Sequence, residues 1–336
     1  MKTITIRNRS LEMPILVPSV SSFETQVSPP SALRLQRALQ EPISLVSAYD
    51  ISLDGNLMPL CQEYRKNGIL LLDSGGYESL RIYKYTNEQT QARWNFTKYA
   101  EVVYQDVYDF IFSFDYFIDN DETYSAFSKR FLRELRRHAD IMDITKLIPV
   151  VHVRTLDGKR SLDINEIVDL VAQVASQLHT IFIAVPEREL GYGIIARANM
   201  ARRIVDAIRK EAEDRYLHIL GCGNLLSFSL FAVAGAMMCD GLEWCRTVTA
   251  ENFHLHHFQQ ADLFAEPRHY IGDPIAEFIL SEAHLEYATM VAARNLMSLQ
   301  AYTNGLHTRL HQRTVSEFVR QHFGETAGTA VRTLET

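Results

Sequence analysis

Residue types suited to catalysis follow directly after the apolar run Ile69–Leu72 of this chain. The run ends on Asp73, and the next residues are Ser74, Gly75, Gly76 and Tyr77. A strand would hold the carboxylate rigidly, glycines let a ligand approach the backbone closely, and an aromatic ring offers a flat face for stacking. The segment is therefore typical of an active-site turn, although an ordinary strand-to-turn junction has the same pattern.

Similar groups stand at the ends of other apolar runs. Asp115, His152 and Asp240 each close or directly follow such a run. An Asp at a strand-to-helix junction commonly caps the next helix, so each carboxylate alone has a structural explanation. Three carboxylates and a histidine that share one edge of a sheet would instead favour catalysis. Glu187 and Glu189, after another run, are further candidates.

The apolar runs have the lengths of buried strands. We predict eight strands, at Pro14–Pro18, Ile43–Ala48, Ile69–Leu72, Phe110–Phe114, Leu147–Val153, Thr180–Val185, Leu217–Leu220 and Ala236–Cys239. Segments with apolar residues at three- and four-residue spacing, typical of helices, separate most of them. This alternation predicts an α/β fold with a closed (β/α)8 TIM barrel, in which active-site residues gather at the C-terminal ends of the strands. An open doubly wound sheet is the alternative.

The barrel would occupy residues 1–250 as the catalytic core, and residues 251–336 would form a closing insert and C-terminal helices packed on the barrel. In the second part we predict a long helix at Pro274–Ala301, a turn at Tyr302–His307, a shorter helix at Thr314–His322 and a frayed end from Glu325 onward.

The composition is that of an ordinary globular protein, with 47% hydrophobic and 22% charged residues among 336. The net charge of −7 argues against a protein that coats nucleic acid nonspecifically, because such proteins carry a basic excess. Lys129, Arg133 and Arg137, on one side of a helical segment, suit either a solvated face or a phosphate track. Since no apolar stretch has the length of a membrane span and no secretory leader is seen, we expect a cytoplasmic protein with reduced cysteines and no membrane association.

The order and spacing of the motifs resemble those of the tRNA-guanine transglycosylase superfamily. That family carries D-S-G-G-[FY]-Q after one strand, a later F-D-E, and D-x-x-x-x-x-R at the eighth strand. The corresponding segments here are Asp73–Tyr77, Phe114-Asp115, Asp240–Arg246, the first-strand segment Met13–Pro18 and the G-x-G segment Leu220–Gly223. The resemblance covers about residues 10–250 and implies a barrel enzyme, a pentosyltransferase that exchanges one nucleobase for another without a cofactor.

The resemblance implies catalytic roles for two aspartates. Asp240 would attack the sugar and form a covalent glycosyl intermediate, as in retaining glycosidases. Asp73 would alternate between general acid and general base, first protonating the departing guanine and then deprotonating the incoming base.

Binding roles follow in the same way. Asp115 would accept hydrogen bonds from the N1–H and exocyclic amine of guanine, and Tyr77 would stack on the flipped or single-stranded base. Arg246 would hold a phosphate or orient its loop, or pair with a neighbouring acid. Ser74, Gly75 and Gly76 complete the binding turn.

The base pocket departs from the family pattern. Family members have Gln after the aromatic, Q-G-G after strand five and G-G after strand six, whereas this chain has Glu78, His152-Val-Arg154 and Ala184–Glu187. His152 would contact O6 or the 7-substituent of the base, or act as a satisfied structural histidine. The roles of Glu78 and Glu187 stay open.

The family's C-x-C-x-x-C zinc site has no counterpart, because no cysteine follows Cys245. His254, His256 and His257 lack thiolate partners and a fourth ligand, so we expect no metal there and a role in packing or nucleic-acid contact. A zinc-free barrel is most similar to the DNA-acting, DpdA-type branch, which exchanges guanine in DNA for a 7-deazaguanine such as 7-cyano-7-deazaguanine. We therefore expect DNA and a free 7-deazaguanine base as substrates, tRNA as the alternative, and a helicase or ATPase partner where a duplex has to be opened.

Two other classes of protein fit the same residues. A non-catalytic nucleic-acid-binding subunit of this fold would not need both Asp73 and Asp240. A metal-dependent lyase would use Asp73, Asp115 and His152 as ligands, and a chelator would abolish its activity.

Overall fold

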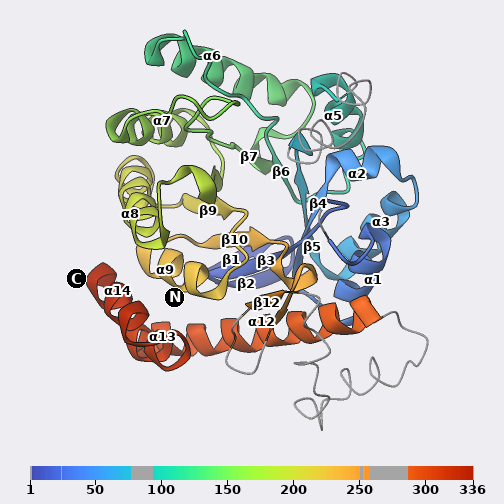
Figure 1. The fold of residues 1–336 in the computed structure, drawn as a ribbon. Helices are drawn as coiled ribbons and strands as arrows, with labels where there is room; N and C mark the ends of the chain where they lie inside the picture. The colour runs from blue at the N-terminus through green and yellow to red at the C-terminus, as the bar shows by residue number, and fades with distance from the viewer. Residues whose placement is uncertain are drawn as a thin grey trace.

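The computed structural model describes residues 2–23, 25–76, 94–249, 253, 255–257 and 287–335. Its centre is a nearly closed barrel of eight parallel strands in the order β7-β6-β5-β4-β3-β10-β9-β8, with helices around it (Figure 1). The strands are β3 (Ile15–Val20), β4 (Ile43–Ser47), β5 (Ile69–Asp73), β6 (Phe110–Phe112), β7 (Leu147–Ile148), β8 (Phe182–Pro186), β9 (Tyr216–Leu220) and β10 (Met238–Gly241). All eight predicted runs form strands, and the predicted α/β barrel is confirmed.

The barrel closes between β7 and β8 with few backbone hydrogen bonds. Strand β7 ends at Ile148, well before the predicted Val153, because Pro149 has no N–H to continue the ladder. Beyond it, Val151 N donates to the Ala184 carbonyl and Ala184 N donates to the Pro149 carbonyl, both at 2.8 Å. A single parallel bridge therefore joins this edge to β8.

Alternation along the strands decides which side chains enter the barrel. In β5, Ile69 and Leu71 belong to the interior apolar cluster, whereas Leu70 and Leu72 pack toward the surrounding helices. The next inward position is Asp73, at the C-terminal mouth. The same period of two carries Met238 inside and aims Asp240 at the mouth.

The surrounding helices follow the strands. They are α1 (Pro29–Ala38), α2 (Ala48–Leu53), α3 (Leu57–Asn67), α5 (Phe96–Val103), α6 (Tyr124–Arg136), α7 (Ile164–Gln177), α8 (Ile194–Glu211) and α9 (Leu225–Ala234). Sequence signals for their ends are clear in two cases: Asp163 and Glu166 form a reciprocal capping box at the start of α7, and Gly235 ends α9 in the left-handed conformation. None of the helices in the described residues combines the length and the apolarity needed to cross a membrane.

An antiparallel hairpin that we did not predict, β1 (Lys2–Ile6) with β2 (Arg9–Met13), covers the N-terminal end of the barrel. Its apolar side chains join the interior cluster. Between its strands, Arg7 reaches Asp109, with Nε 2.8 Å from Oδ1 and Nη2 2.9 Å from Oδ2. Asp109 also accepts from Arg65 Nε at 3.3 Å and from Leu70 N at 2.9 Å, and its side chain is only 2% exposed.

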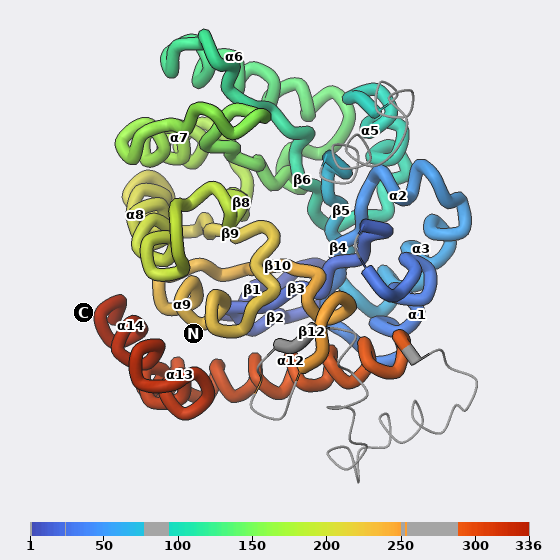
Figure 2. Tube along the Cα trace, viewed as in Figure 1, coloured from blue at the N-terminus to red at the C-terminus, as the bar shows by residue number. Residues whose placement is uncertain are grey.

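The C-terminal part consists of α12 (Tyr287–Gln312), α13 (Val315–Phe323) and α14 (Glu325–Glu335), together with a small sheet of β11 (Thr247–Thr249) and β12 (Leu255–His257). Helix α12 passes along the barrel near β11, and α13 and α14 pack against α9 (Figure 2).

Two expectations for this part were wrong. The predicted turn at Tyr302–His307 is helical and continues α12, because Tyr302 and Leu306 are fully buried and Gly305 leaves room for the ring of Phe318. The predicted fraying after Glu325 is replaced by α14, whose Val331 is buried. The first half of the predicted helix Pro274–Ala301 lies outside the described residues.

Candidate active site

The strand-end residues line one cavity of about 270 Å³ at the C-terminal mouth of the barrel. This volume is just below the range of about 300 to 1,000 Å³ that is usual for small-ligand sites. Its wall contains the predicted site residues Asp73, Ser74, Asp115, His152, Asp240 and Arg246, together with the further candidate Glu189. It also contains residues that were not predicted, among them Ser19, Phe117 and Arg188. Tyr77 and Glu78 lie outside the described residues.

Asp240 is 5% exposed and is held at both oxygens. Ser19 Oγ donates to Oδ2 at 2.9 Å, while Oδ1 is 2.8 Å from His218 Nε2 and accepts from Gly221 N at 3.3 Å. These contacts fix the carboxylate at the cavity wall, with its rotamer set by three donors from β3 and from the end of β9.

His218 is a site residue that we did not predict. It stands at an inward position of β9, because its neighbours Leu217 and Ile219 pack toward the helices, and it is fully buried. Phe112 packs edge-on against its ring at 5.0 Å, and Nδ1 has no hydrogen-bond partner in the described part of the chain. A carboxylate can only accept, so Nε2 carries the proton toward Asp240. A histidine inside an apolar strand, three positions before the glycine turn that begins at Gly221, is the signal that could have revealed it.

The turn after β5 is shaped by close contacts. Asp73 Oδ2 accepts from Gly75 N at 3.1 Å, and Gly75 has φ +76°. A Cβ on Gly75 would lie 2.5 Å from Cβ of Tyr49, and a Cβ on Gly76 would lie 1.8 Å from Oδ2 of Asp115. Contacts within the protein therefore already exclude a side chain at both positions, whether or not a ligand also needs the space.

Asp115 belongs to an ionic chain that crosses three strand ends. Its Oδ2 accepts from Ser74 Oγ at 3.1 Å, and its Oδ1 is 3.1 Å from His152 Nε2. The other ring nitrogen of His152 is 2.9 Å from Glu189 Oε1, while Glu189 Oε2 accepts from Val153 N at 2.8 Å. Glu187 has a separate role, since it pairs with Arg197 at 3.1 Å.

His152 is charged in this arrangement. Burial alone would lower its pKa, but the hydrogen bonds to Asp115 and Glu189, together with the charges of the two carboxylates, outweigh it and raise the pKa from 6.5 to about 10. Phe117 covers the ring, with the ring centroids 4.0 Å apart and the two planes tilted by 31°. Since both ring nitrogens donate to carboxylates, His152 offers no lone pair to a metal or a base here, and its effect on a ligand passes through Asp115.

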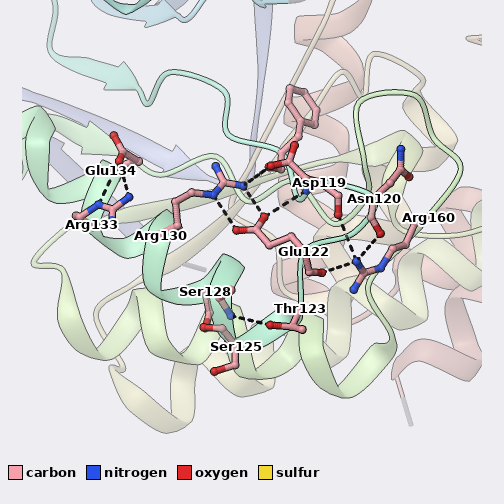
Figure 3. Close-up of polar contacts among 12 residues, drawn as sticks. Asp119, Asn120, Glu122, Thr123, Ser125, Ser128, Arg130, Arg133, Glu134 and Arg160 are labelled. Carbon is pink, nitrogen blue, oxygen red and sulfur yellow. Dashed lines mark hydrogen bonds and ion pairs between the residues drawn. The ribbon is translucent and has the colours of Figure 1, made fainter.

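Two arginines hold the loop that carries Asp115 and Phe117 (Figure 3). Arg130 Nη2 donates to the Phe117 carbonyl at 2.7 Å and its guanidinium grips Glu122 through two hydrogen bonds of 2.9 and 2.7 Å. Arg160 Nη1 donates to the Asn120 carbonyl at 3.1 Å and also to that of Glu122. The loop is thereby tied to α6 and to the loop before α7, which keeps Asp115 in place.

Two further basic residues, one in α6 and one directly after it, share an acidic partner. Arg133 and Arg137 both pair with Glu134, at 3.2 and 2.6 Å, which suits the solvated-face interpretation of this helix.

Among the described residues, no group of three or more His, Cys, Asp and Glu side chains is arranged to hold a metal ion. His254 and the side chains of His256 and His257 are outside that part of the chain. No protein-family model matches the chain, and no curated protein matches it.

Proposed function

We propose that this chain is a base-exchange transglycosylase that replaces guanine in DNA with a 7-deazaguanine through a covalent glycosyl-aspartate intermediate. The observation that carries the proposal is the pair of carboxylates Asp73 and Asp240 in one cavity. They come from β5 and β10, which β4 and β3 separate in the barrel, so they approach a ligand from different walls. Two carboxylates on different sides of a glycosidic bond are the arrangement that retaining glycosyl transfer uses.

In the first half of the reaction, Asp240 attacks the anomeric carbon of the target nucleotide. Its Oδ2 accepts one hydrogen bond and its Oδ1 accepts two, so Oδ2 is the better nucleophile. The bond from the sugar to guanine N9 breaks, its electron pair goes to the base, and Asp73 in its acid form supplies a proton to the departing guanine.

In the second half, Asp73 as carboxylate takes the N9 proton of the incoming 7-deazaguanine. The freed electron pair of N9 attacks the anomeric carbon, and the ester to Asp240 breaks with its electrons returning to the carboxylate. One glycosidic bond is lost and one is formed, so the exchange needs no oxidant and no nucleotide triphosphate.

Selection of guanine is assigned to Asp115. Asp115 accepts a hydrogen bond from His152 Nε2, and a carboxylate offers only acceptors, which suits the paired donors N1–H and exocyclic amine of guanine and of a 7-deazaguanine. Adenine has an acceptor at N1, which would face the acceptor oxygens of Asp115 and could not form a hydrogen bond with them. Of the two roles expected for His152, direct contact with the base would require it to give up one of its two carboxylates, whereas the structural role would not.

The choice of DNA rests on the resemblance to the zinc-free branch, and the test is built to separate it from tRNA. The protein is incubated with single-stranded DNA or with tRNA containing labelled guanine, in the presence of unlabelled 7-cyano-7-deazaguanine, and release of label is counted. We expect release from DNA, loss of release in Asp240→Asn, and a folded Asp240→Asn protein by circular dichroism.

Release from tRNA alone would overturn the DNA assignment. Release from DNA by Asp240→Asn at the parent rate would overturn the covalent mechanism. Binding of DNA without any release by the parent would favour a non-catalytic binding subunit.

A further inference from the structure

Tyr192 is the most exposed large hydrophobic side chain in the described residues, with its full surface open to solvent. It stands between Gly191 and Gly193, which have φ values of +122° and +78°. Positive φ values on both sides of one residue make the loop turn tightly at this point. Residues with a side chain rarely adopt such φ values, which explains the two glycines. The chain thus presents an aromatic ring at the tip of a narrow loop instead of packing it.

The stem of this loop is fixed. Arg197, in the first turn of α8, donates from Nε to the Gly191 carbonyl at 2.9 Å and pairs with Glu187 at 3.1 Å. Leu190 is buried, and its N–H donates to the Glu187 carbonyl at 3.2 Å. A rigid stem with an exposed tip is pre-organised for contact, so little conformational entropy would be lost when a partner covers the ring.

The loop follows β8 and therefore lies at the mouth end of the barrel. The same segment contributes Arg188 to the cavity wall, and the neighbouring strand end contributes Arg154 and Leu156. Leu156 is 58% exposed, and Ile195, one turn beyond the tip, is 47% exposed. Cations at the rim next to exposed apolar and aromatic surface form a combination suited to a flexible polyanion with flat rings.

We infer that Tyr192 is a stacking platform for a base that neighbours the target nucleotide in single-stranded DNA, with the phosphates of that strand passing the rim arginines Arg154 and Arg188. The inference rests on the proposed function. When a nucleotide enters the cavity, the bases next to it in the strand lose a stacking partner. An exposed tyrosine ring next to the mouth would take the place of that partner. The contact reads no base identity, because every base offers a π-face.

The test measures binding of a labelled single-stranded DNA oligonucleotide with one guanine by fluorescence anisotropy. We expect Tyr192→Ala to weaken binding about tenfold and Tyr192→Phe to bind like the parent, because stacking needs the ring and not the hydroxyl. The salt dependence of binding should not change in Tyr192→Ala, since no charge is removed. Tyr104→Ala is the matched control: Tyr104 is 61% exposed, but it ends α5 at the opposite end of the barrel, and its loss should leave binding unchanged.

A second arm places an abasic site beside the guanine. If Tyr192 stacks on that base, the abasic site weakens binding to the parent, and it weakens binding to Tyr192→Ala much less. Parent-like binding by Tyr192→Ala, with guanine exchange in DNA intact, would overturn the inference and leave the proposed function standing.

Two further outcomes separate the inference from the function. A Tyr192→Ala defect seen with RNA and not with DNA would overturn the assignment of the strand. A parent protein that neither binds nor exchanges any oligonucleotide would remove the function and the inference together.

Discussion

The two oxygens of Asp240 accept different numbers of hydrogen bonds. His218 bonds to Oδ1, whereas Oδ2 is the oxygen that we assign to the attack. Without the donor at 2.8 Å, the carboxylate would turn about its last torsion and Oδ2 would leave the line of attack. Misplacement of a reacting atom by about 1 Å costs on the order of 10²-fold in rate.

We therefore expect His218→Leu to lower kcat on the order of 10²-fold with little change in KM for DNA. His218→Gln, whose amide N–H reaches toward the position of Nε2, should recover part of the loss. Steady-state exchange kinetics check both, with thermal unfolding curves as a control for the buried site. Equal kcat values for His218→Leu and the parent would remove the positioning role.

His152 makes stability depend on pH in a defined window. Its pKa is raised from 6.5 to about 10 in the folded chain, so the folded state keeps a proton that the unfolded state loses. The stabilising contribution is fully present below about pH 6.5 and disappears as the pH rises through about 10.

The free energy of unfolding of the parent should accordingly fall between pH 7 and 10 by more than that of His152→Gln, which has no proton to lose. Urea unfolding at several pH values measures the difference. Parallel pH curves for the two proteins would show that His152 is not held as the cation.

At the scale of elements, the hairpin β1–β2 is fastened to the barrel through Asp109. This carboxylate is nearly inaccessible, whereas its arginine partners Arg7 and Arg65 are about one-third exposed. Removing Asp109 takes away the opposite charge of both arginines and the carboxylate acceptor of the Leu70 N–H.

Asp109→Ala should lower the free energy of unfolding by about 3 kcal/mol, near the lower end for a broken buried ion pair because water can reach the arginines. Glu63→Ala is the comparison, since its pair with Arg37 is half-exposed on both sides and should be worth about 0.5 kcal/mol or less. Chemical denaturation gives both values. Similar losses in the two variants would mean that the hairpin does not depend on this contact.

At the scale of the whole molecule, the barrel was predictable because strands buried on both faces are continuous apolar runs that turn residues interrupt. The hairpin was not, since Lys2–Ile6 alternates buried and exposed residues and stands on its own before the first parallel strand. The turn predicted at Tyr302–His307 is absent, because α12 continues there with Tyr302 and Leu306 buried and the ring of Phe318 against Gly305.

The candidate site likewise contains residues that the sequence could predict and residues that it could not. Asp73, Asp115 and Asp240 could be predicted because the end of an apolar run marks the mouth of a barrel. His218 could not be found in this way, since it lies within its run, and the pairing of Glu189 with His152 depends on how two loops meet. Contacts between loops are set by tertiary packing, which no local pattern encodes.

The seam between β7 and β8 gives one more consequence. Pro149 leaves the backbone there with a single bridge, and the chain Asp115–His152–Glu189 spans the same gap from side chain to side chain. A ligand that hydrogen-bonds to Asp115 would therefore contact the same row of side chains that joins the two edge strands of the barrel.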